Sequence, residues 1–450
     1  MPKPSEELGT ENISSLLIKQ SVPASIGFLV MSIYSIVDTI FVGRFVGPLA
    51  IGAITVVLPI SFLISSMGMA IGIGGASIIS RALGRNERKR ALKTFGNMVN
   101  LTLHLSVALV ILGFVFDDAI LTIFGGKGDI LPLSKEYFEI LLIGVPFLAW
   151  SMMSNNVIRA QGKPKVAMLI MVIPAVLNII LDPVFIILLD MGLAGAAWAT
   201  TISYIISAAY ALVYFIKGES EISFVLKYFK LDFGLIREIF AIGSITLARQ
   251  GSVSLLIVVL NHTLYAYAGE IGISIYGIVN RVMMFALFPV IGIVQGFLPI
   301  AGYNYGAGNA SRVKSSIDVA IKYGSVLASL ILLLIVLFSD KVVNAFTTDA
   351  QLIRESSFAL KFVFMMTPLI AVQLVGSGYF QAIGKALPAL LLTMTKQGFF
   401  LIPLVLILPN IFGVNGIWYS FPIADVLSAL VTWFFLKMEI KKHLVFSPAA

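Results

Sequence analysis

Long apolar stretches recur along the whole chain, and short polar segments separate them. Each stretch is long enough to cross about 30 Å of hydrocarbon as a helix. In lipid such a segment must be helical, because a helix satisfies its own backbone hydrogen bonds. We predict twelve spans, at residues 16–42, 49–80, 91–115, 136–160, 165–189, 193–216, 235–260, 271–299, 318–338, 357–382, 386–409 and 414–437.

The composition supports an all-α integral membrane protein. Hydrophobic residues make up 58% of the chain, charged residues 12%, and the mean hydropathy is +0.98. A soluble domain carries about twice that share of charge. The formal net charge is +8, but the basic residues lie in short loops between apolar spans. They therefore indicate membrane topology and not a nucleic-acid partner. The chain has no cysteine, which excludes disulfides.

The loops alternate in their content of Lys and Arg. The segments after spans 2, 4, 6 and 8 and the C-terminal tail are basic, with Arg81–Arg90, Arg159, Lys163, Lys165, Lys217, Lys227, Lys230, Arg237, Arg312, Lys314, Lys437, Lys441 and Lys442. The intervening loops are poorer in these residues, and one carries Asp117, Asp118 and Asp129. Positive loops stay in the cytoplasm, so both termini are expected inside.

The sequence is internally duplicated. Matching residues stand 222 positions apart in three separate loops: Gly84 and Gly306, Arg90 and Arg312, Ala160 and Ala382, Gly162 and Gly384, Lys163 and Lys385. Each half holds six spans, an even number, so both halves enter the membrane in the same sense, related by a pseudo-twofold axis along the membrane normal. We predict an N-lobe at residues 1–217, a cytoplasmic linker at 218–234 and a C-lobe at 235–450.

Two lobes of this kind indicate a transporter, in which one lobe rocks against the other around a central site. A channel is more often an oligomer of shorter subunits around a shared pore. An intramembrane enzyme would need a catalytic cluster, and the sequence contains no zinc motif and no nucleophile elbow. We therefore expect no enzymatic activity.

Carboxylates at membrane depth mark the N-lobe. Asp38 lies near the outer end of span 1, and Asp182 lies in the outer part of span 5. Asn178 is four residues before Asp182 and shares its helix face. Thr200 and Thr201 enter span 6 at a matching depth. Such oxygens suit Na⁺, and the same carboxylates suit a proton, since burial and like charge both favour the protonated form. Local roles, an end cap for Asp38 and a hydrogen bond at the Pro183 kink for Asp182, remain alternatives.

The C-lobe carries a different set of charges near the midplane. Arg249, Arg281, Lys396 and Asp425 all fall well inside their spans. The simplest interpretation is a structural charge network in which Asp425 pairs with Lys396 or with Arg281. Gln250 and Gln373 are uncharged and could line a cavity.

Several motifs resemble the multidrug and toxic compound extrusion (MATE) family along nearly the whole chain. They are YSIVDTIFVG at 34–43, IGIGG at 71–75 with Ser80 and Arg81, IRAQGKP at 158–164, LNIILDP at 177–183, GAAWAT at 195–200 and YGIVNR at 276–281. The Asn178 and Asp182 pattern is similar to the DinF/MepA-like branch. In the NorM-like branch acidic residues stand in spans 7 and 10, where this chain has Gln250 and Gln373.

The resemblance implies secondary active multidrug efflux: antiport of amphipathic, often cationic small molecules against H⁺ or Na⁺ by alternating access, without ATP and without another cofactor. It places the coupling site, with Na⁺ as one possible ion, on Asp38, Asn178, Asp182 and Thr200, with Thr201 as the alternative to its neighbour. Candidates for the substrate cavity are Tyr34, Asn155, Gln250, Arg281 and Gln373. A monomer in the inner membrane of a prokaryotic cell, multi-pass and embedded in the bilayer, is the expected setting.

A flippase for a lipid-linked saccharide is the main alternative, because its architecture is related. Such a protein needs a strongly cationic cavity to bind pyrophosphate, and Arg249, Arg281 and Lys396 keep this alternative open.

The predicted topology can be tested by labelling single cysteines, since the natural chain has none. Cysteines placed at Asn86 and at Lys442 should react only with reagents that reach the cytoplasm. Labelling of either position by an impermeant reagent outside intact cells would contradict the orientation.

Overall fold

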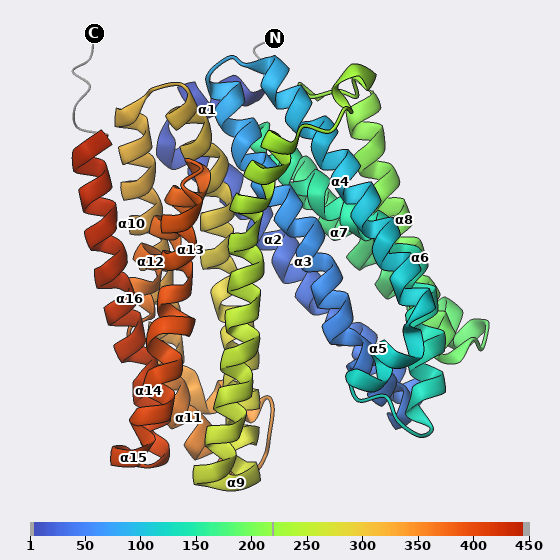
Figure 1. Cartoon of the computed structure of the whole chain (residues 1–450). Coiled ribbons are helices and arrows are strands. Elements are labelled where there is room, and N and C mark those ends of the chain that lie inside the picture. Colours follow the sequence, from blue (N-terminus) through green and yellow to red (C-terminus); the bar gives the residue numbers. More distant parts are fainter. Residues whose placement is uncertain (1–3, 218–219, 444–450) are drawn as a thin grey trace. The chain divides into compact units, whose positions relative to one another are not determined.

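The computed structural model describes residues 4–217 and 220–443 (Figure 1). Within these residues all regular structure is helical, as expected for segments that must satisfy their own backbone in lipid. Residues 218–219 of the predicted linker lie outside the described residues, as do both chain ends at 1–3 and 444–450.

The first half of the chain forms six long helical segments. Three short elements accompany them: η1 (Pro4–Glu6) and α1 (Glu7–Thr10) at the start, and α5 (Asp117–Ile123). The long segments are α2 (Ile13–Phe45), α3 (Pro48–Gly84), α4 (Arg88–Val115), α6 (Ile130–Ala160), α7 (Pro164–Asp182) with its extension η2 (Pro183–Leu188), and α8 (Gly192–Ile216). Helices α3, α4 and α6 pack against one another.

The second half follows the short helix η3 (Leu226–Tyr228). It comprises α9 (Phe233–Gly306), α10 (Ala310–Asn344), α11 (Ala350–Phe364), α12 (Thr367–Ala382), α13 (Ala386–Met394), η4 (Thr395–Leu401), α14 (Ile402–Ile407), α15 (Pro409–Phe412) and α16 (Val414–His443). Helix α12 packs between α10 and α16 (Figure 1).

All twelve predicted spans lie on helices. Ten helices of the described chain are long and apolar enough to cross a membrane, and α11 with α12, bent by 47°, form an eleventh span. Helix α9 carries two predicted spans on either side of Gly269, whose backbone is not helical (φ 61°). A glycine adopts this conformation without steric cost, so the chain turns there from one span into the next. The sequence did not predict α5.

The chain divides into two compact units, and the first long helix of each half contributes residues to both units. Unit 1 contains residues 4–7 and 26–246, and unit 2 contains residues 8–25 and 247–443. Helix α2 therefore begins in unit 2 and ends in unit 1, whereas α9 begins in unit 1 and continues in unit 2. The borders predicted from the sequence, at 217 and 235, kept each of these helices whole within one lobe.

Two segments of π-helix interrupt the α-helical spans. The segment η2 begins at Pro183, directly after Asp182. Proline has no N–H to donate, and its ring clashes with the carbonyl of residue i−4, which favours a wider turn. The segment η4 begins at Thr395 and contains the buried Lys396. Both interruptions therefore coincide with an ionisable side chain at membrane depth.

Unit 2 neutralises its buried charge internally. The Nζ atom of Lys396 lies 2.5 Å from Oδ1 of Asp425, and the two side chains are 10% and 0% exposed. Arg281, the other partner considered for Asp425, is exposed and lies outside this ion pair. The contact joins η4 to α16, so it links two helices of the same unit.

We expect Asp425→Ala to lower the thermal stability of the protein. Removing one partner of a buried ion pair leaves an uncompensated charge, which costs about 3–5 kcal/mol in the free energy of unfolding. The double variant Lys396→Met/Asp425→Leu should recover much of this loss, because no charge remains buried. Melting followed in detergent measures both effects. A single variant that melts like the wild type but no longer transports would refute the structural role.

Candidate functional site

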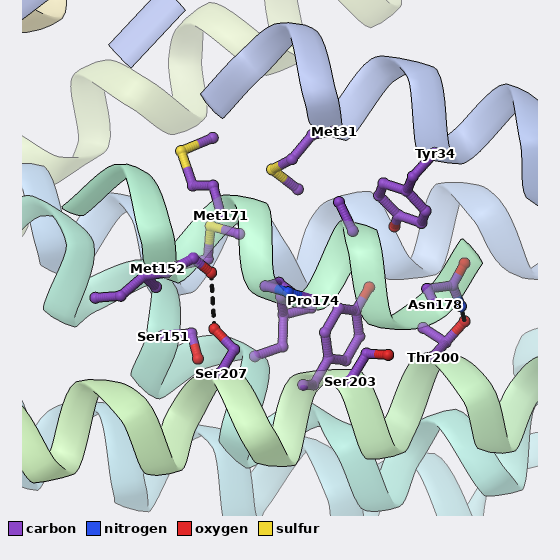
Figure 2. A pocket seen from close by; sticks show the side chains of 14 residues that line it. Met31, Tyr34, Ser151, Met152, Met171, Pro174, Asn178, Thr200, Ser203 and Ser207 are labelled. Atoms are coloured by element: carbon purple, nitrogen blue, oxygen red, sulfur yellow. Dashed lines mark hydrogen bonds between the residues drawn. The ribbon is translucent and has the colours of Figure 1, made fainter. Parts of the chain in front are cut away.

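A small cavity lies inside unit 1, between α2, α6, α7 and α8 (Figure 2). Its wall is mainly apolar and aromatic, with hydroxyl and amide groups on α6, α7 and α8. The lining residues are Met31, Tyr34, Leu148, Ser151, Met152, Ile170, Met171, Pro174, Ala175, Asn178, Thr200, Ser203, Tyr204 and Ser207. The three methionines are unbranched and can change rotamer, so the narrow cavity can widen around a ligand.

Polar groups of α7 and α8 meet at one end of this cavity. Asn178 and Thr200 are buried, and the amide nitrogen of Asn178 lies 3.0 Å from the hydroxyl of Thr200. With the amide rotated by 180°, its nitrogen donates to Oδ2 of Asp182 at 3.1 Å and its oxygen accepts from Thr200. This orientation satisfies all three side chains. The spacing of four residues along α7 thus places Asn178 against Asp182, as the sequence predicted.

Asp182 is fully buried, at the junction between α7 and η2. No lysine, arginine or histidine of the described chain forms an ion pair with it. Its neighbours are neutral donors and a second carboxylate, since Asp38 interacts with it electrostatically. Two acidic groups that share a low-dielectric space are coupled, and adding a cation or a proton relieves their repulsion.

Asp38 lies on α2 and is 9% exposed. Among the described residues, its Oδ1 atom is buried without a hydrogen-bond partner. Three tyrosines, Tyr34, Tyr137 and Tyr204, interact electrostatically with Asp38, and the hydroxyls of Tyr34 and Tyr204 interact with each other. A buried carboxylate oxygen without a donor is costly while it is ionised. This oxygen is therefore available to a proton or to a cation.

Helix α2 joins the carboxylate to the cavity. Met31, Tyr34 and Asp38 are three and four residues apart, so they project from one face of the helix. The first two line the cavity, and the third belongs to the acidic pair. One turn earlier, a side chain at Gly27 would come within 2.9 Å of the sulfur of Met171, which shows how closely α2 approaches α7.

Two of the residues proposed for the N-lobe are engaged elsewhere. The hydroxyl of Thr201 donates to the carbonyl of Ile140 on α6, at 3.0 Å, and points away from Asn178. Of the two threonines, Thr200 is thus the one that contacts Asn178. The amide of Asn155 donates to the carbonyl of Ala167, and its oxygen accepts from Arg159. Asn155 is buried one turn beyond Ser151, outside the cavity lining.

The remaining cavity candidates belong to unit 2. Gln250 and Arg281 are exposed, and Gln373 is buried with its amide donating to the carbonyl of Leu392 at 2.9 Å. None of them lines the cavity of unit 1. Gln373 connects α12 to α13 within its own unit.

The sequence did not single out several residues of this site. Tyr137 and Tyr204 interact electrostatically with Asp38, and Ser203 and Ser207 line the cavity. A signal was present on α8, because Thr200, Ser203 and Ser207 form a polar stripe at helical spacing in an otherwise apolar span. Tyr137 had no such signal, because only the packing of α6 brings it to Asp38.

Comparisons with known proteins identify the family of the chain. The MatE family model matches residues 23–184 and 248–407. The multidrug export protein MepA of Staphylococcus aureus (strain MSSA476) is 31% identical over 412 residues, which cover 91% of this chain and 90% of that protein. MepA of Staphylococcus haemolyticus (strain JCSC1435) is 29% identical over 425 residues, 94% of this chain and 93% of the relative.

Solved structures show the same fold. An outward-facing multidrug resistance MATE family transporter of the MOP superfamily superposes with a TM-score of 0.93 at 25% identity, covering 98% of this chain and 99% of that one. A MOP superfamily transporter from Pyrococcus furiosus gives 0.91 at 26% identity, with 97% of both chains covered. The matched blocks of the family model fall in both repeat halves, over most of the sequence. This multi-pass membrane protein therefore belongs to the MatE family, the multidrug and toxic compound extrusion family that its sequence motifs resemble.

Proposed function

We propose that this protein exports amphipathic, often cationic small molecules in exchange for H⁺ or Na⁺, by alternating access. The observation that carries the proposal is the buried Oδ1 of Asp38, which has no hydrogen-bond partner in the described chain. The carboxylate of Asp38 also interacts electrostatically with that of the buried Asp182. A pair of buried carboxylates is stabilised strongly when a proton or a cation binds to it. The multidrug export proteins among the relatives support the choice of substrate class.

Coupling follows from the shared face of α2. A cation that binds between Asp38 and Asp182 removes their repulsion and lets α2 approach α7 and α8. Because Met31 and Tyr34 project from the same face, this movement changes the shape of the cavity. Pro23 and Gly27 weaken α2 locally and allow it to bend. The cation and the substrate would thus each stabilise a different conformation of α2.

Either ion fits the groups present. Na⁺ would take oxygen ligands from Asp38, Asp182, the Asn178 amide and the Thr200 hydroxyl, whereas a proton needs only one carboxylate oxygen. Among the described residues no cluster of three or more acidic, histidine or cysteine side chains is present, so a transition-metal or calcium site is not part of the proposal.

The substrate class follows from the cavity lining. Methionine and tyrosine side chains give an adaptable apolar wall, and the nearby carboxylates favour a positive charge. The flippase alternative needs several free cationic groups. Of the three basic residues considered for it, Lys396 is neutralised by Asp425, which weakens the flippase alternative.

We further propose that the protein acts as a monomer in the cytoplasmic membrane with both termini inside. The orientation rests on the basic loops, and it places Asp38 and Asp182 toward the outer side. Ions would then enter the acidic site from outside, as an antiporter driven by an inward gradient requires.

The proposal can be tested by efflux from proteoliposomes loaded with ethidium. A pH gradient and a Na⁺ gradient are imposed separately, each without a membrane potential. Efflux accelerated by one of them identifies the coupling ion. Efflux that responds to neither would contradict coupled antiport, and covalent change of ethidium would contradict transport as the only activity.

Asp38→Asn should abolish gradient-driven efflux while leaving the fold intact. Asparagine keeps the shape of the side chain but neither binds a proton nor offers a full negative charge. We expect at least about a hundredfold loss of coupled rate, the size of effect seen when a buried charged group loses 3 kcal/mol or more.

The matched control for this variant is Asp118→Asn, because the Asp118 side chain is 66% exposed and lies on α5. It should transport like the wild type. A well-folded Asp38→Asn protein that still responds to the ion gradient would remove Asp38 from the mechanism.

The adjacent threonines provide a second test. Thr200→Val should raise the ion concentration for half-maximal efflux by about fivefold, because it removes one hydrogen bond of about 1 kcal/mol at the acidic site. Thr201→Val removes the bond to the Ile140 carbonyl instead and should lower stability without changing ion affinity. Equal ion affinities in the two variants would contradict this assignment.

A further inference from the structure

The first part of α9 is a helical arm that belongs to unit 1, although the rest of the helix belongs to unit 2. We call residues 233–246 the α9 arm. Its start is fixed by side chains: the Oδ1 atom of Asp232 accepts from the backbone N–H groups of Gly234 and Leu235. The backbone N–H of Asp232 in turn donates to Asn97 on α4, at 2.8 Å.

The α9 arm lies close to α3, in contacts that only small residues permit. A Cβ atom on Gly74 would lie 2.2 Å from the carbonyl oxygen of Ile239, and one on Gly243 would lie 2.6 Å from that of Ala70. Ile239 is completely buried. This packing, together with the buried side chains of Ile242 and Ile245, positions the arm.

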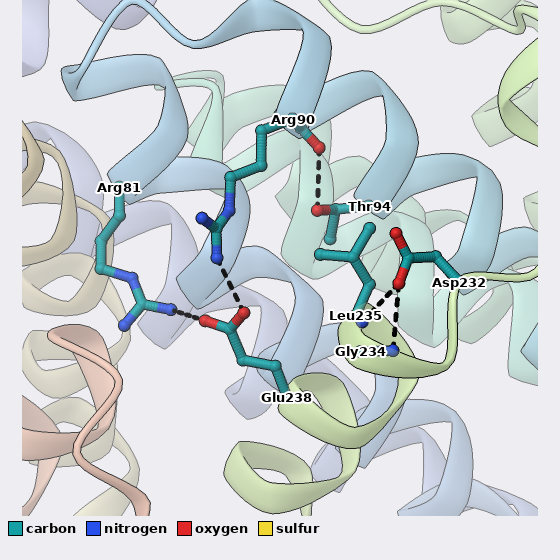
Figure 3. Close-up of polar contacts among 7 residues, drawn as sticks. All are labelled: Arg81, Arg90, Thr94, Asp232, Gly234, Leu235 and Glu238. Carbon is teal, nitrogen blue, oxygen red and sulfur yellow. Dashed lines mark hydrogen bonds and ion pairs between the residues drawn. The ribbon is translucent and has the colours of Figure 1, made fainter.

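A charged cluster provides the directional contact. Glu238 of the arm interacts with two arginines, one through each carboxylate oxygen (Figure 3). Nη2 of Arg81 lies 2.9 Å from Oε1, and Nη2 of Arg90 lies 2.9 Å from Oε2. The side chains of Arg81, Glu238 and Arg90 are 10%, 31% and 42% exposed. Water can therefore replace these contacts when the arm moves.

The repeat places an equivalent arm in unit 2, at residues 8–25 of the N-terminal segment and α2. There Gly296 approaches Ser21, and these residues stand 222 positions from Gly74 and Gly243, respectively. Arg312, the counterpart of Arg90, donates to the backbone carbonyls of Leu8 and Glu11 at 3.3 and 2.7 Å. The same arginine position thus contacts both arms: Arg90 donates to the carboxylate of Glu238, whereas Arg312 donates to backbone carbonyls.

We propose that Glu238 is a positioning residue for transport, and that its contacts with Arg81 and Arg90 form a releasable latch for the α9 arm. This inference rests on the proposed alternating access. Because α9 belongs to both units, a movement of one unit against the other must either bend the helix near Thr246 or detach the arm. The latch holds the arm in the described conformation and opens when the transporter changes its access.

A cysteine in place of Ile239 reports the position of the arm in this cysteine-free protein. The site is buried while the arm is docked, so a maleimide should react slowly with Ile239→Cys. Adding Glu238→Gln should raise the labelling rate by about fivefold, the factor expected from two partly exposed ion pairs. High salt should raise the rate in the Ile239→Cys protein by screening the latch, and should have little effect once Glu238 is replaced.

Three controls isolate the latch. Val157→Cys, equally buried in unit 1 but outside the arm, should label slowly with and without Glu238→Gln. Arg312→Gln, which affects the other arm, should leave labelling at position 239 unchanged. Arg90→Gln should raise the labelling rate at position 239. In the double variant with Glu238→Gln the rate should rise by less than the product of the two separate factors, because both substitutions remove the same contact.

Transport conditions give the decisive readout. Ethidium together with the effective ion gradient should raise the labelling rate at position 239 in proteoliposomes, and Glu238→Gln should change the efflux rate without altering the melting temperature by more than a few degrees. Labelling that is insensitive to Glu238→Gln, to salt and to turnover would overturn the latch. If labelling responds to Glu238→Gln and to salt but no ion gradient drives efflux, the proposal of coupled antiport is refuted. The contacts of Glu238 would then still hold the arm in the resting protein.

Discussion

Hydrocarbon offers no partner to a backbone N–H or C=O group, and this constraint shapes the whole protein. It forces the spans to be helices and makes every departure from the α-helix notable. Two of the departures are the π-helical segments η2 and η4, and in each an ionisable residue, Asp182 or Lys396, stands at or beside the first turn. A widened turn frees backbone groups and shifts side chains, so it can accommodate a polar group where a regular helix would bury it unfavourably.

The two repeat halves treat buried charge in opposite ways. In unit 2, Lys396 and Asp425 neutralise each other. The positions 222 residues earlier are Pro174 and Ser203, and both line the cavity of unit 1. The ion pair of one half thus occupies positions that correspond to the cavity wall in the other. The two halves share one helical scaffold, but at these positions unit 2 has an ion pair and unit 1 has the wall of a cavity.

The acidic site of unit 1 consists of buried carboxylates that have no basic partner in the described part of the chain. Asp38 and Asp182 meet amide, hydroxyl and phenol groups, but none of the described basic side chains forms an ion pair with either. Neutral donors stabilise a carboxylate less than a lysine does, so the site remains responsive to an added ion.

The sequence by itself determined the helical class, the twelve spans and the repeat, and it predicted the acidic residues, because hydrophobic length and rare intramembrane charges are local signals. The i, i+4 spacing also placed Asn178 beside Asp182. Only the tertiary structure decided between Thr200 and Thr201, selected Lys396 over Arg281 as the partner of Asp425, and brought Tyr137 to Asp38. These choices depend on helix rotation and packing, and a one-residue change in register turns a side chain by about 100°. The exchange of the first helical arms was likewise invisible, because a continuous apolar helix carries no local mark of where it passes from one unit to the other.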